Sequence, residues 1–438
     1  MKILILDSSI NTDSIAVSIR TALTNELRAR GAEVEYILLS EKKIANCQGD
    51  FFCWVRSPGM CAIDDDNRAI ACSLINSDVL IYLTPITFGG YSSQLKRTVD
   101  HMIQNISPFF TRVNGEIHHQ RRYQHYPSLL VLGWLPNQDT TSADIFRHLV
   151  YRNGLNMHAP VAVAGVVYAS QTAEDIGGWV KDNLDAVLSG KGLVKAALPS
   201  IETGSDSNSG ETRRALLLIG SPRGKTSTSQ ALGGYLFEQL ASQGIQIETI
   251  RLYSMMKSTS LMRKLFDAVD SADLVTLAFP LYVDSLSGPV MGILERIAEH
   301  RRTNVPSHWQ RLTAIVNCGF PESAHNNTAL AICHNFARLT GFEWAGGLSL
   351  GGGEGVVHGT SLHELDGRAI PLKKSLELAA QALAVGKLIP QEAVALMAKS
   401  VVSPWLYWML GGYGWKQQAK SYGVQNQLKA RPYEVRLI

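Results

Sequence analysis

The sequence lacks a strong excess of charge of either sign. Its 438 residues carry 41 lysines and arginines against 38 aspartates and glutamates, which gives a formal net charge of +3. Proteins that bind nucleic acids or anionic membranes through their net charge carry a clear basic excess. The near balance therefore predicts that neither nucleic acid nor an anionic membrane surface is a partner.

The sequence also lacks a long apolar run. A membrane-spanning helix needs about 20 consecutive apolar residues, and the nearest approach, residues 401–414, is interrupted by Pro404 and three glycines. At the amino end, Lys2 leads directly into a short strand-like run, which does not fit a secretory signal. We therefore expect a cytoplasmic protein that is not inserted in a membrane.

Cysteine is scarce, and its placement argues against a disulfide framework. The chain holds six cysteines, four of them between Cys47 and Cys72. Chains of this length that depend on disulfides spread many cysteines over the sequence and occur in oxidising compartments. We therefore expect reduced thiols.

What the sequence does contain is an internal duplication. Residues 79–102 hold an apolar run, a turn with Pro85 and two glycines, and a helical pattern. Residues 274–297 repeat the order of strand, proline, aromatic residue, glycine and amphipathic helix, and the strand at 2–9 is matched at 215–224. A period of about two hundred residues is too long for a solenoid. The repeated unit is therefore a whole domain.

Strand and helix patterns alternate in both halves, which predicts parallel, doubly wound sheets. The Ser/Gly/Asp-rich residues 199–212 are typical of a linker. We therefore predict domains at residues 1–198 and 213–398, followed by an aromatic, helical tail at 399–438 that packs across a domain surface or a subunit interface. The His-rich residues 118–125 indicate a solvated loop, with a phosphate contact by Arg121 and Arg122 as the alternative.

The turn at residues 220–229, GSPRGKTSTS, carries the clearest signal for a phosphate. It lies directly between a predicted strand and a predicted helix. Its hydroxyls, the N–H groups of the helix start and the charges of Arg223 and Lys225 suit a phosphate monoester. A serine-rich capping turn is the alternative interpretation.

The corresponding turn of the first domain, DSSINTDS at residues 7–14, keeps the hydroxyls but has no cation. Asp7 and Asp13 stand there instead. A carboxylate about 5 Å from a phosphate costs on the order of 3 kcal/mol per unit charge at an effective dielectric constant near 20. Unless these acids point away, this turn is the poorer phosphate site.

The loop after the strand at residues 79–83 suits a flat ligand. In an open α/β sheet, ligands bind in loops at the carboxyl ends of strands. Gly89 and Gly90 let backbone N–H groups approach closely, and Phe88 and Tyr91 add aromatic surface. Because no acid or base is prominent in the loop, we expect a cofactor that carries its own chemistry and no catalytic side chain. The glycine-rich residues 351–355 fit no dinucleotide motif and indicate a flexible loop, with a loop that covers a ligand as the alternative.

These motifs resemble the NADPH-dependent FMN reductase family, within the flavodoxin-like fold. Residues 220–223 with Ser227 and Thr228 are similar to the family's first flavin loop, and residues 84–90 with 94–96 and Asp100 to its isoalloxazine loop and following helix. The resemblance implies an α/β chain of two tandem flavodoxin-like sheets of strand order 2-1-3-4-5, with FMN at the switch point and NAD(P)H as co-substrate. It also implies dimers, here a pseudo-dimer within the chain or a homo-oligomer.

The resemblance further implies two sets of cofactor-binding residues. The phosphate set is Ser221, Arg223, Ser227, Thr228 and Ser229, with Ser8 and Ser14 in the first domain. The ring set is Pro85, Ile86, Thr87, Phe88, Gly89 and Gly90 in the first domain and Pro280, Leu281, Tyr282, Val283 and Asp284 in the second.

The chain departs from the family pattern in both copies. Asp7 and Ile10 stand where the family has Gly and Arg, and Met291 and Glu295 replace the helix Lys and Asp. One copy is therefore a candidate pseudo-domain, and the sequence leaves open which one.

The cysteine-rich loop resembles that of the family's iron–sulfur flavoprotein branch, which uses four cysteines. Here Cys47, Cys53 and Cys61 are present, and Asp50 stands at the second position. A cubane cluster requires four thiolates. We therefore expect thiols that pack the loop and no metal, with a cluster completed by Asp50 or Cys72 as the alternative.

The function that follows is an FMN-dependent NAD(P)H oxidoreductase of the flavin or quinone reductase type, which passes electrons to a small-molecule acceptor. Two alternatives remain open at this stage. One is an FMN-binding electron-transfer module that serves a protein partner, and the other is a flavin-free scaffold.

Overall fold

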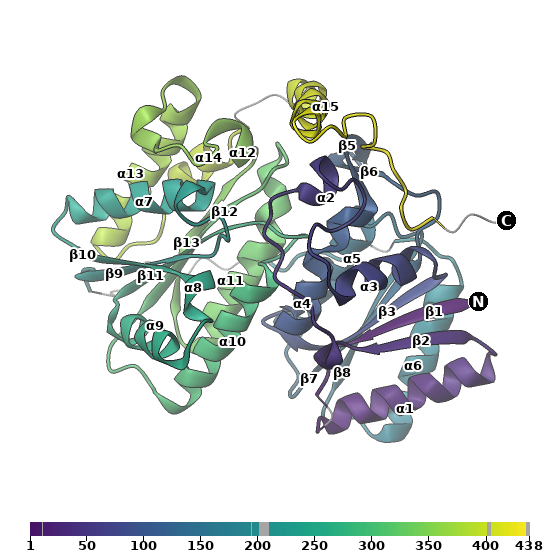
Figure 1. The fold of residues 1–438 in the computed structure, drawn as a ribbon. Coiled ribbons are helices and arrows are strands. Elements are labelled where there is room, and N and C mark those ends of the chain that lie inside the picture. Colours follow the sequence, from purple (N-terminus) through teal and green to yellow (C-terminus); the bar gives the residue numbers. More distant parts are fainter. Residues whose placement is uncertain (11, 194, 201–209, 401–403, 435–438) are drawn as a thin grey trace. The chain divides into compact units, whose positions relative to one another are not determined.

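The computed structural model describes residues 1–10, 12–193, 195–200, 210–400 and 404–434, so most of the predicted linker and the start of the predicted tail lie outside the described residues. The chain divides into two compact units (Figure 1). Domain 1 comprises Met1–Pro199 and Trp408–Ile438, and domain 2 comprises Ser200–Tyr407. Among the described residues, no helix is long and apolar enough to cross a membrane.

Domain 1 contains a parallel sheet of order β2-β1-β3-β7-β8. Its strands are β1 (Lys2–Asp7), β2 (Glu33–Leu38), β3 (Val79–Thr87), β7 (Ser128–Leu135) and β8 (Ala162–Tyr168). Counted among the parallel strands alone, this is the predicted order 2-1-3-4-5, and the predicted fold class is confirmed. The central strand β3 is almost wholly buried because helices cover both of its faces, as its continuous apolar run predicts.

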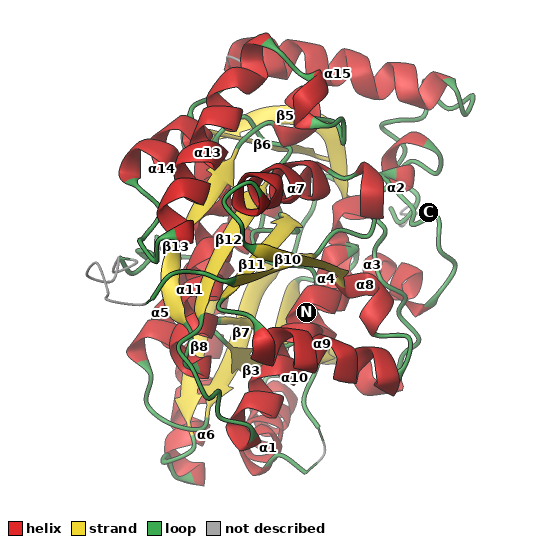
Figure 2. Ribbon diagram, turned by 90° about the vertical axis from the view of Figure 1, so that its left-hand side faces the viewer, coloured by secondary structure: helices red, strands yellow, loops and turns green. Residues whose placement is uncertain are grey.

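Helices lie on both faces of this sheet, as Figures 1 and 2 show. On one face α1 (Ser14–Ala29) packs against α6 (Ala173–Leu188), and Ile19, Leu23, Val180 and Leu184 join strand residues in one buried cluster. The opposite face carries the helices α3 (Asp66–Ile75), α4 (Ser93–Asp100) and α5 (Thr140–Asn156). Shorter elements of this domain are η1 (Leu39–Glu41), α2 (Phe52–Val55), η2 (Met102–Asn105) and β4 (Gly90–Tyr91).

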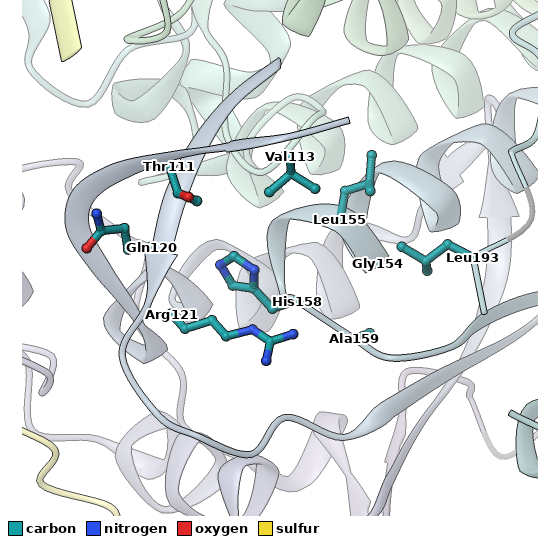
Figure 3. Close-up of a pocket in the computed structure, with 9 residues that line it drawn as sticks. All are labelled: Thr111, Val113, Gln120, Arg121, Gly154, Leu155, His158, Ala159 and Leu193. Carbon is teal, nitrogen blue, oxygen red and sulfur yellow. The ribbon is translucent and has the colours of Figure 1, made fainter. Parts of the chain in front are cut away.

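A β-hairpin replaces the solvated loop that the His-rich stretch predicted, so that prediction is wrong. Strands β5 (Ile106–Val113) and β6 (Glu116–Arg121) pair antiparallel. His118 is fully buried, and the ring of His119 lies between Trp54 and Phe110, with centroids 4.6 and 5.0 Å away. Burial of the imidazole lowers the pKa of His119 to about 3. The other face of the hairpin lines a cavity (Figure 3).

Arg122 anchors the C-terminal segment and does not extend into solvent. Its guanidinium donates to the carbonyl oxygens of Leu428 (3.1 Å) and Ala430 (2.7 Å). The helix α15 (Pro404–Lys420) leads into this segment, and Trp415 makes edge contacts with Phe51 and Trp54. From Trp415 onward, the described part of the tail therefore packs on domain 1.

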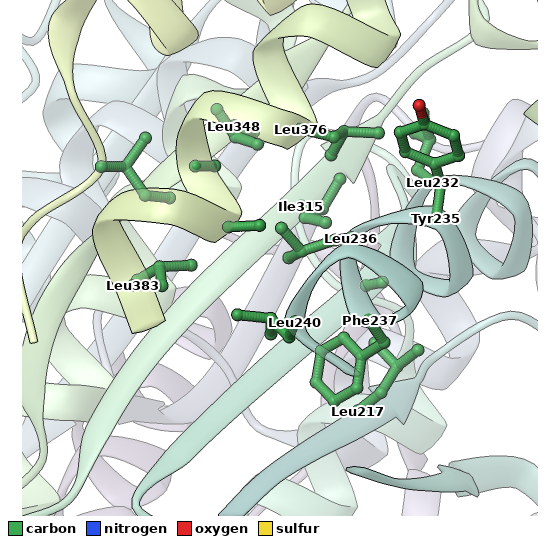
Figure 4. Close-up of a cluster of buried hydrophobic side chains, with 14 of the residues drawn as sticks. Leu217, Leu232, Tyr235, Leu236, Phe237, Leu240, Ile315, Leu348, Leu376 and Leu383 are labelled. Atoms are coloured by element: carbon green, nitrogen blue, oxygen red, sulfur yellow. The ribbon is translucent and has the colours of Figure 1, made fainter. Parts of the chain in front are cut away.

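Domain 2 repeats the sheet in the order β10-β9-β11-β12-β13. Its parallel strands are β9 (Arg214–Ile219), β10 (Gln246–Arg251), β11 (Leu274–Pro280), β12 (Arg311–Asn317) and β13 (Glu343–Leu350). The core lies between this sheet and the helices α7 (Thr228–Ala241) and α13 (Ile370–Ala384), where Leu217, Leu236, Ile315 and Leu376 meet (Figure 4). The two domains therefore share one topology, as the duplication predicts.

The remaining helices of domain 2 complete both layers. The opposite face of the sheet carries α9 (Thr259–Ser271), α10 (Gly288–Thr303) and α11 (Asn327–Thr340). The helix α14 (Gln391–Ala398) packs against α13. The shorter elements are η3 (Gly224–Thr226), α8 (Leu252–Met255), η4 (Ser323–Asn326), α12 (Gly353–Val356), η5 (Leu362–Glu364) and η6 (Gly367–Ala369).

Candidate functional site

In each domain the predicted phosphate turn and ring loop leave adjacent strands. β1 pairs directly with β3, and β9 with β11. The first residues of both phosphate turns are tied to the neighbouring strand in the same way: Ser8 N–H donates to Leu83 O (2.9 Å) and Gly220 N–H to Ala278 O (2.8 Å). Both pairs of loops thus meet at the carboxyl edge of a sheet, where the strand order reverses.

The phosphate turn of domain 2 uses some of its hydroxyls internally. Ser227 caps α7 by accepting from Gln230 N–H (3.1 Å), and Ser229 donates to the Asn317 side chain (2.9 Å). The Ser221 hydroxyl accepts a long bond of 3.4 Å from Arg223 N–H. Thr228 is 4% exposed, and its hydroxyl has no partner among the described residues. A buried hydroxyl without a partner is costly unless a ligand meets it.

The cations of this turn are held differently. Lys225 is exposed, whereas Arg223 Nη1 lies 2.5 Å from Glu354 Oε1. The same carboxylate oxygen lies 3.3 Å from His358 Nδ1. Glu354 belongs to α12, in the glycine-rich segment that the sequence indicated as a flexible loop. In the unliganded chain, a carboxylate therefore neutralises the arginine that we predicted to hold a phosphate.

The segment around α12 packs tightly against the phosphate turn. A Cβ atom added to Gly359, whose φ is +72°, would lie 2.0 Å from the Thr226 carbonyl oxygen. One added to Gly353 would lie 3.2 Å from Thr228 Cγ2. Because only glycine permits this approach, the glycine-rich composition of the segment has a structural cause here.

The phosphate turn of domain 1 is closed by its own acids. Asp13 caps α1 by accepting from the N–H groups of Ile15 (3.0 Å) and Ala16 (3.2 Å), and it also accepts from Trp134 Nε1 (2.7 Å). These N–H groups are the ones that a phosphate at a helix start would meet. Asp13 therefore takes the place of an external anion.

Asp7 is fully buried in the same turn and points into it. Its carboxylate accepts from Ser9 N–H (2.7 Å) and from the Tyr36 hydroxyl, and Arg20 Nε lies 3.9 Å away. The Ser8 hydroxyl donates to Leu83 O (3.0 Å), and Ser14 is exposed on the first turn of α1. A phosphate could bind to this turn only if its acids pointed away from it. Asp7 and Asp13 point into the turn, so this condition is not met.

The two ring loops share one backbone geometry. In domain 1, Thr87 pairs with Gly90 around Phe88 (φ 54°) and Gly89 (φ 88°). In domain 2, Tyr282 pairs with Ser285 around Val283 (φ 41°) and Asp284 (φ 58°). Two successive positive φ angles are typical of a two-residue turn that favours Asn and Gly. Val283 is β-branched, so its left-handed backbone is strained, as is found at ligand-binding sites.

Burial differs between the predicted ring residues of the two domains. In domain 1, Ile86, Phe88, Gly89 and Gly90 are buried and only Pro85 and Thr87 are partly exposed. In domain 2, Asp284 is buried, whereas the following predicted residues are partly exposed: Pro280, Leu281, Tyr282 and Val283. The loop of domain 2 thus presents more side-chain surface at its sheet edge.

The helix after each ring loop differs as the sequence departures indicate. In α4, Lys96 and Asp100 form an ion pair with both side chains 1% exposed. In α10 a buried Met291 stands at the matching position. At the start of α4, Ser92 joins the two loops of domain 1 by donating to the Ser8 hydroxyl (2.9 Å) and accepting from Thr84 (3.1 Å). The hydroxyls of domain 1 are thus bonded to one another.

The cysteine-rich loop encloses a small space. Cys47, Cys53, Cys61, Asp50 and His101 line a cavity of about 20 Å³, which is the space of about one water. Asp50 accepts from Phe52 N–H (3.0 Å), and Cys61 Sγ lies 3.5 Å from His101 Nδ1. Burial raises the pKa of the Cys47 thiol to about 12.

A cubane cluster requires four thiolates, whereas only Cys47, Cys53 and Cys61 line this space and Asp50 stands at the remaining position. In the described part of the chain, no group of three or more His, Cys, Asp or Glu side chains could hold a metal ion. The residues present therefore do not fit an iron–sulfur cluster. That the loop binds no metal stays a prediction.

Several residues of the domain 2 site were missed at the sequence level. Glu354, His358 and Asn317 reach the phosphate turn from segments far along the chain. The glycine-rich composition of residues 351–355 was the available signal, but it does not tell which partner the segment meets.

Comparison with known proteins agrees with this architecture. Residues 213–358 match the model of the flavodoxin-like fold, so the chain is a tandem of two flavodoxin-like domains. Residues 1–125 match the model of the NADPH-dependent FMN reductase family. The predicted resemblance is therefore confirmed, and it is domain 1 that matches the reductase family.

The chain is also similar to iron–sulfur flavoproteins of archaea. One from Methanocaldococcus jannaschii is 37% identical over 82 residues, which are 19% of this chain and 41% of that protein. One from Methanosarcina thermophila is 30% identical over 76 residues, which are 17% of this chain and 39% of that protein. The similarity thus spans well under half of these relatives.

Among solved structures, the chain is similar to an NAD(P)H:quinone oxidoreductase from Methanothermobacter marburgensis, with 16% identity and a TM-score of 0.32, covering 44% of this chain and 96% of that one. An FMN-dependent NADH-azoreductase from Bacillus anthracis has 14% identity and a TM-score of 0.30, covering 39% of this chain and 99% of that one.

Proposed function

We propose that this chain is an FMN-dependent NAD(P)H oxidoreductase and that it binds the FMN phosphate at the first turn of domain 2. The carrying observation is the contrast between the two phosphate turns. In domain 1 the carboxylates of Asp7 and Asp13 accept the N–H groups of the turn. In domain 2 the turn carries Arg223, which pairs with Glu354 at its edge, the exposed Lys225 and the unpartnered hydroxyl of Thr228. A dianion is repelled by the first turn and attracted by the second.

The match of domain 1 to the NADPH-dependent FMN reductase family supports a flavin as the ligand. In the proposal, the helix start of α7 and the hydroxyls of Ser221 and Thr228 orient the phosphate, and Arg223 neutralises it. The strained turn at Val283 and Asp284 borders the isoalloxazine ring. When bound, FMN supplies the hydride chemistry. The chain itself contributes binding and orientation, so no side-chain acid or base is required.

Substitution of Arg223 tests whether this turn binds the phosphate. We expect Arg223→Ala to weaken FMN binding by about 1–2 kcal/mol, because a charge-assisted contact to the phosphate is lost. The measurement is titration of FMN fluorescence with purified chain. Arg302→Ala is the matched control, since Arg302 is an exposed arginine of domain 2 that pairs with Glu299. Unchanged affinity in Arg223→Ala would move the phosphate away from domain 2.

The activity needs a separate measurement. Reconstituted chain should bleach its flavin absorbance when NADPH or NADH is added without oxygen, and a small acceptor such as a quinone should restore the colour. A flavin that stays oxidised with both nucleotides would overturn the oxidoreductase proposal and favour the electron-transfer module. If the chain does not bind FMN at all, only the flavin-free scaffold remains as an interpretation. A small-molecule acceptor and a cytoplasmic location are part of the proposal.

A further inference from the structure

Domain 1 contains a cavity of about 350 Å³ that none of the flavin motifs explains. Figure 3 shows its walls, which come from the hairpin β5–β6, the last turn of α5 and the segment after α6. Its volume lies in the range of small-molecule sites, which begin at about 300 Å³. The lining residues are Thr111, Val113, Gln120, Arg121, Gly154, Leu155, His158, Ala159 and Leu193.

The walls are held in place by specific contacts. On one face of the hairpin, the His119 ring contacts Phe110 and Trp54. Thr111 and Val113 lie on the other face, which borders the cavity. Leu193 bridges to Ala162 at the start of β8. A Cβ atom on Gly154 would lie 2.8 Å from Leu193 Cδ2, so glycine permits this approach. The cavity is therefore part of the packed domain and not a gap between mobile loops.

The cavity lies at the opposite edge of the sheet from the phosphate turn and ring loop of domain 1. α5 begins after the carboxyl end of β7 and ends just before the amino end of β8. Its last turn, with Leu155, and His158 just after it are thus at the amino edge of the sheet. The phosphate turns and ring loops lie at the carboxyl edge, so the cavity is a separate site.

The lining of the cavity carries positive charge and no negative charge. Arg121 is the single formally charged side chain among the nine lining residues, and it is exposed at the end of β6. The nearby Glu116 carboxylate is already paired with Arg152 (2.5 Å) and lies 3.3 Å from His118 Nε2. An anion entering the cavity therefore meets an arginine and no carboxylate of the lining.

His158 restricts the ligand further. Its Nε2 lies 2.8 Å from His119 O, and because a carbonyl only accepts, Nε2 carries the proton. Burial lowers the pKa of His158 to about 4, so the ring is neutral near pH 7. The remaining ring nitrogen, Nδ1, is then an acceptor, which disfavours a second carboxylate beside it. The rest of the lining includes the apolar Val113, Leu155, Ala159 and Leu193.

We propose that this cavity binds a small organic monocarboxylate with an apolar body, whose carboxylate pairs with Arg121 and whose body packs on Val113, Leu155 and Leu193. The site is independent of the flavin site and does not rest on the function proposed above.

The test is isothermal titration calorimetry of the full chain with benzoate, in the presence of saturating FMN so that the flavin edge is not probed. Benzoate should bind at one site, and the neutral benzamide should bind about tenfold more weakly. Arg121→Gln should weaken benzoate about tenfold. Arg112→Gln, an exposed arginine on the same hairpin outside the lining, should leave it unchanged.

A steric variant keeps the proposal falsifiable if the charge effect is small. Val113→Trp places a large side chain in the cavity from a half-buried position, and it should abolish benzoate binding while circular dichroism stays unchanged. No measurable heat with benzoate in the parent chain would overturn the proposal. Equal binding to the parent, Arg121→Gln and Val113→Trp would also overturn it, because benzoate would then sit elsewhere.

Discussion

At the scale of single residues, carboxylates decide which phosphate turn is open. Asp13 accepts two helix N–H groups and Asp7 accepts one turn N–H, so domain 1 holds fixed negative charges where a phosphate would lie. Glu354 does something different in domain 2, because it pairs with a cation at the edge of the turn and leaves the N–H groups of the turn alone. A partly exposed pair of this kind is worth little in stability and can exchange partners.

We therefore expect Glu354→Gln to bind FMN more tightly, by about three- to tenfold, because the phosphate no longer competes with a carboxylate for Arg223. FMN fluorescence titration at low ionic strength measures the change. Glu299→Gln, which removes an exposed carboxylate paired with Arg302, serves as the matched control and should leave the affinity within twofold. Weaker binding in Glu354→Gln would mean that Glu354 orients Arg223 for the ligand.

His119 gives domain 1 a dependence on pH whose sign follows from its pKa. The folded-state pKa is lowered to about 3 from an ordinary value near 6.5, so between these values the unfolded chain binds the extra proton. Stability is then lost as the pH falls from about 6.5. From pH 7 to pH 5 we expect His119 to account for a loss of about 2 kcal/mol in the free energy of unfolding, measured by urea titration of tryptophan fluorescence.

His119→Phe should remove this part of the loss, because phenylalanine keeps the stacking on Trp54 without a titrating group. His363→Phe changes an exposed histidine of domain 2 that lies beside Glu238 and should preserve the pH dependence. If both variants lose stability equally between pH 7 and pH 5, another group is responsible.

At the scale of elements, the hairpin β5–β6 connects domain 1 to the end of the chain. Arg122, which follows its second strand, donates to Ile106 O in the first strand (3.2 Å) and to the carbonyl oxygens of Leu428 and Ala430 in the segment after α15. A buried guanidinium with backbone acceptors is expensive to remove because the acceptors lose their partner. The C-terminal segment is thus held by side-chain contacts, those of Arg122 and the hydrogen bonds of Tyr433 with Asn76, Tyr123 and Gln104.

We expect Arg122→Ala to release this segment, with a loss of about 2–3 kcal/mol in the free energy of unfolding of domain 1. Limited proteolysis followed by mass spectrometry should detect earlier cleavage after residue 420. Arg121→Ala, at the adjacent exposed position, is the control and should be cut like the parent chain. Equal cleavage of all three proteins would show that the aromatic contacts of Trp415 suffice.

At the scale of the whole molecule, the duplication has left two copies with unequal sites. Domain 1 matches the NADPH-dependent FMN reductase family but has a closed phosphate turn, and domain 2 matches the flavodoxin-like fold and has the cationic turn. The predicted domain limits, the pseudo-dimer and the homo-oligomer stay predictions.

This asymmetry predicts one FMN per chain and not two. Anaerobic absorbance spectra of reconstituted protein, with flavin and iron quantified per mole of chain, provide the measurement. We expect one FMN and no iron, because the turn of domain 1 is blocked and the cysteine-rich loop offers three thiols where a cubane cluster requires four. Two FMN per chain would show that Asp7 and Asp13 move on binding. Iron would show that the cysteine loop rearranges.

The repeated fold follows from local sequence patterns alone. Apolar runs such as residues 79–83 and 274–278 form strands because the pattern is local and burial on both faces demands it. The positions of the phosphate turns and ring loops followed, since they are fixed by where strands end. The two-residue turn at Gly89 was also visible, because glycine tolerates its positive φ.

Only the tertiary structure decided which turn is open and what the His-rich stretch does. Asp7 meets Tyr36 across strands, Asp13 meets Trp134, and Arg223 meets Glu354, which lies 131 residues away. His118 and His119 lie in a strand, and His118 is buried, because Asn156 and Trp54 supply partners that no local pattern announces. The direction of a charged side chain depends on partners brought together by folding, and short-range sequence carries no record of them.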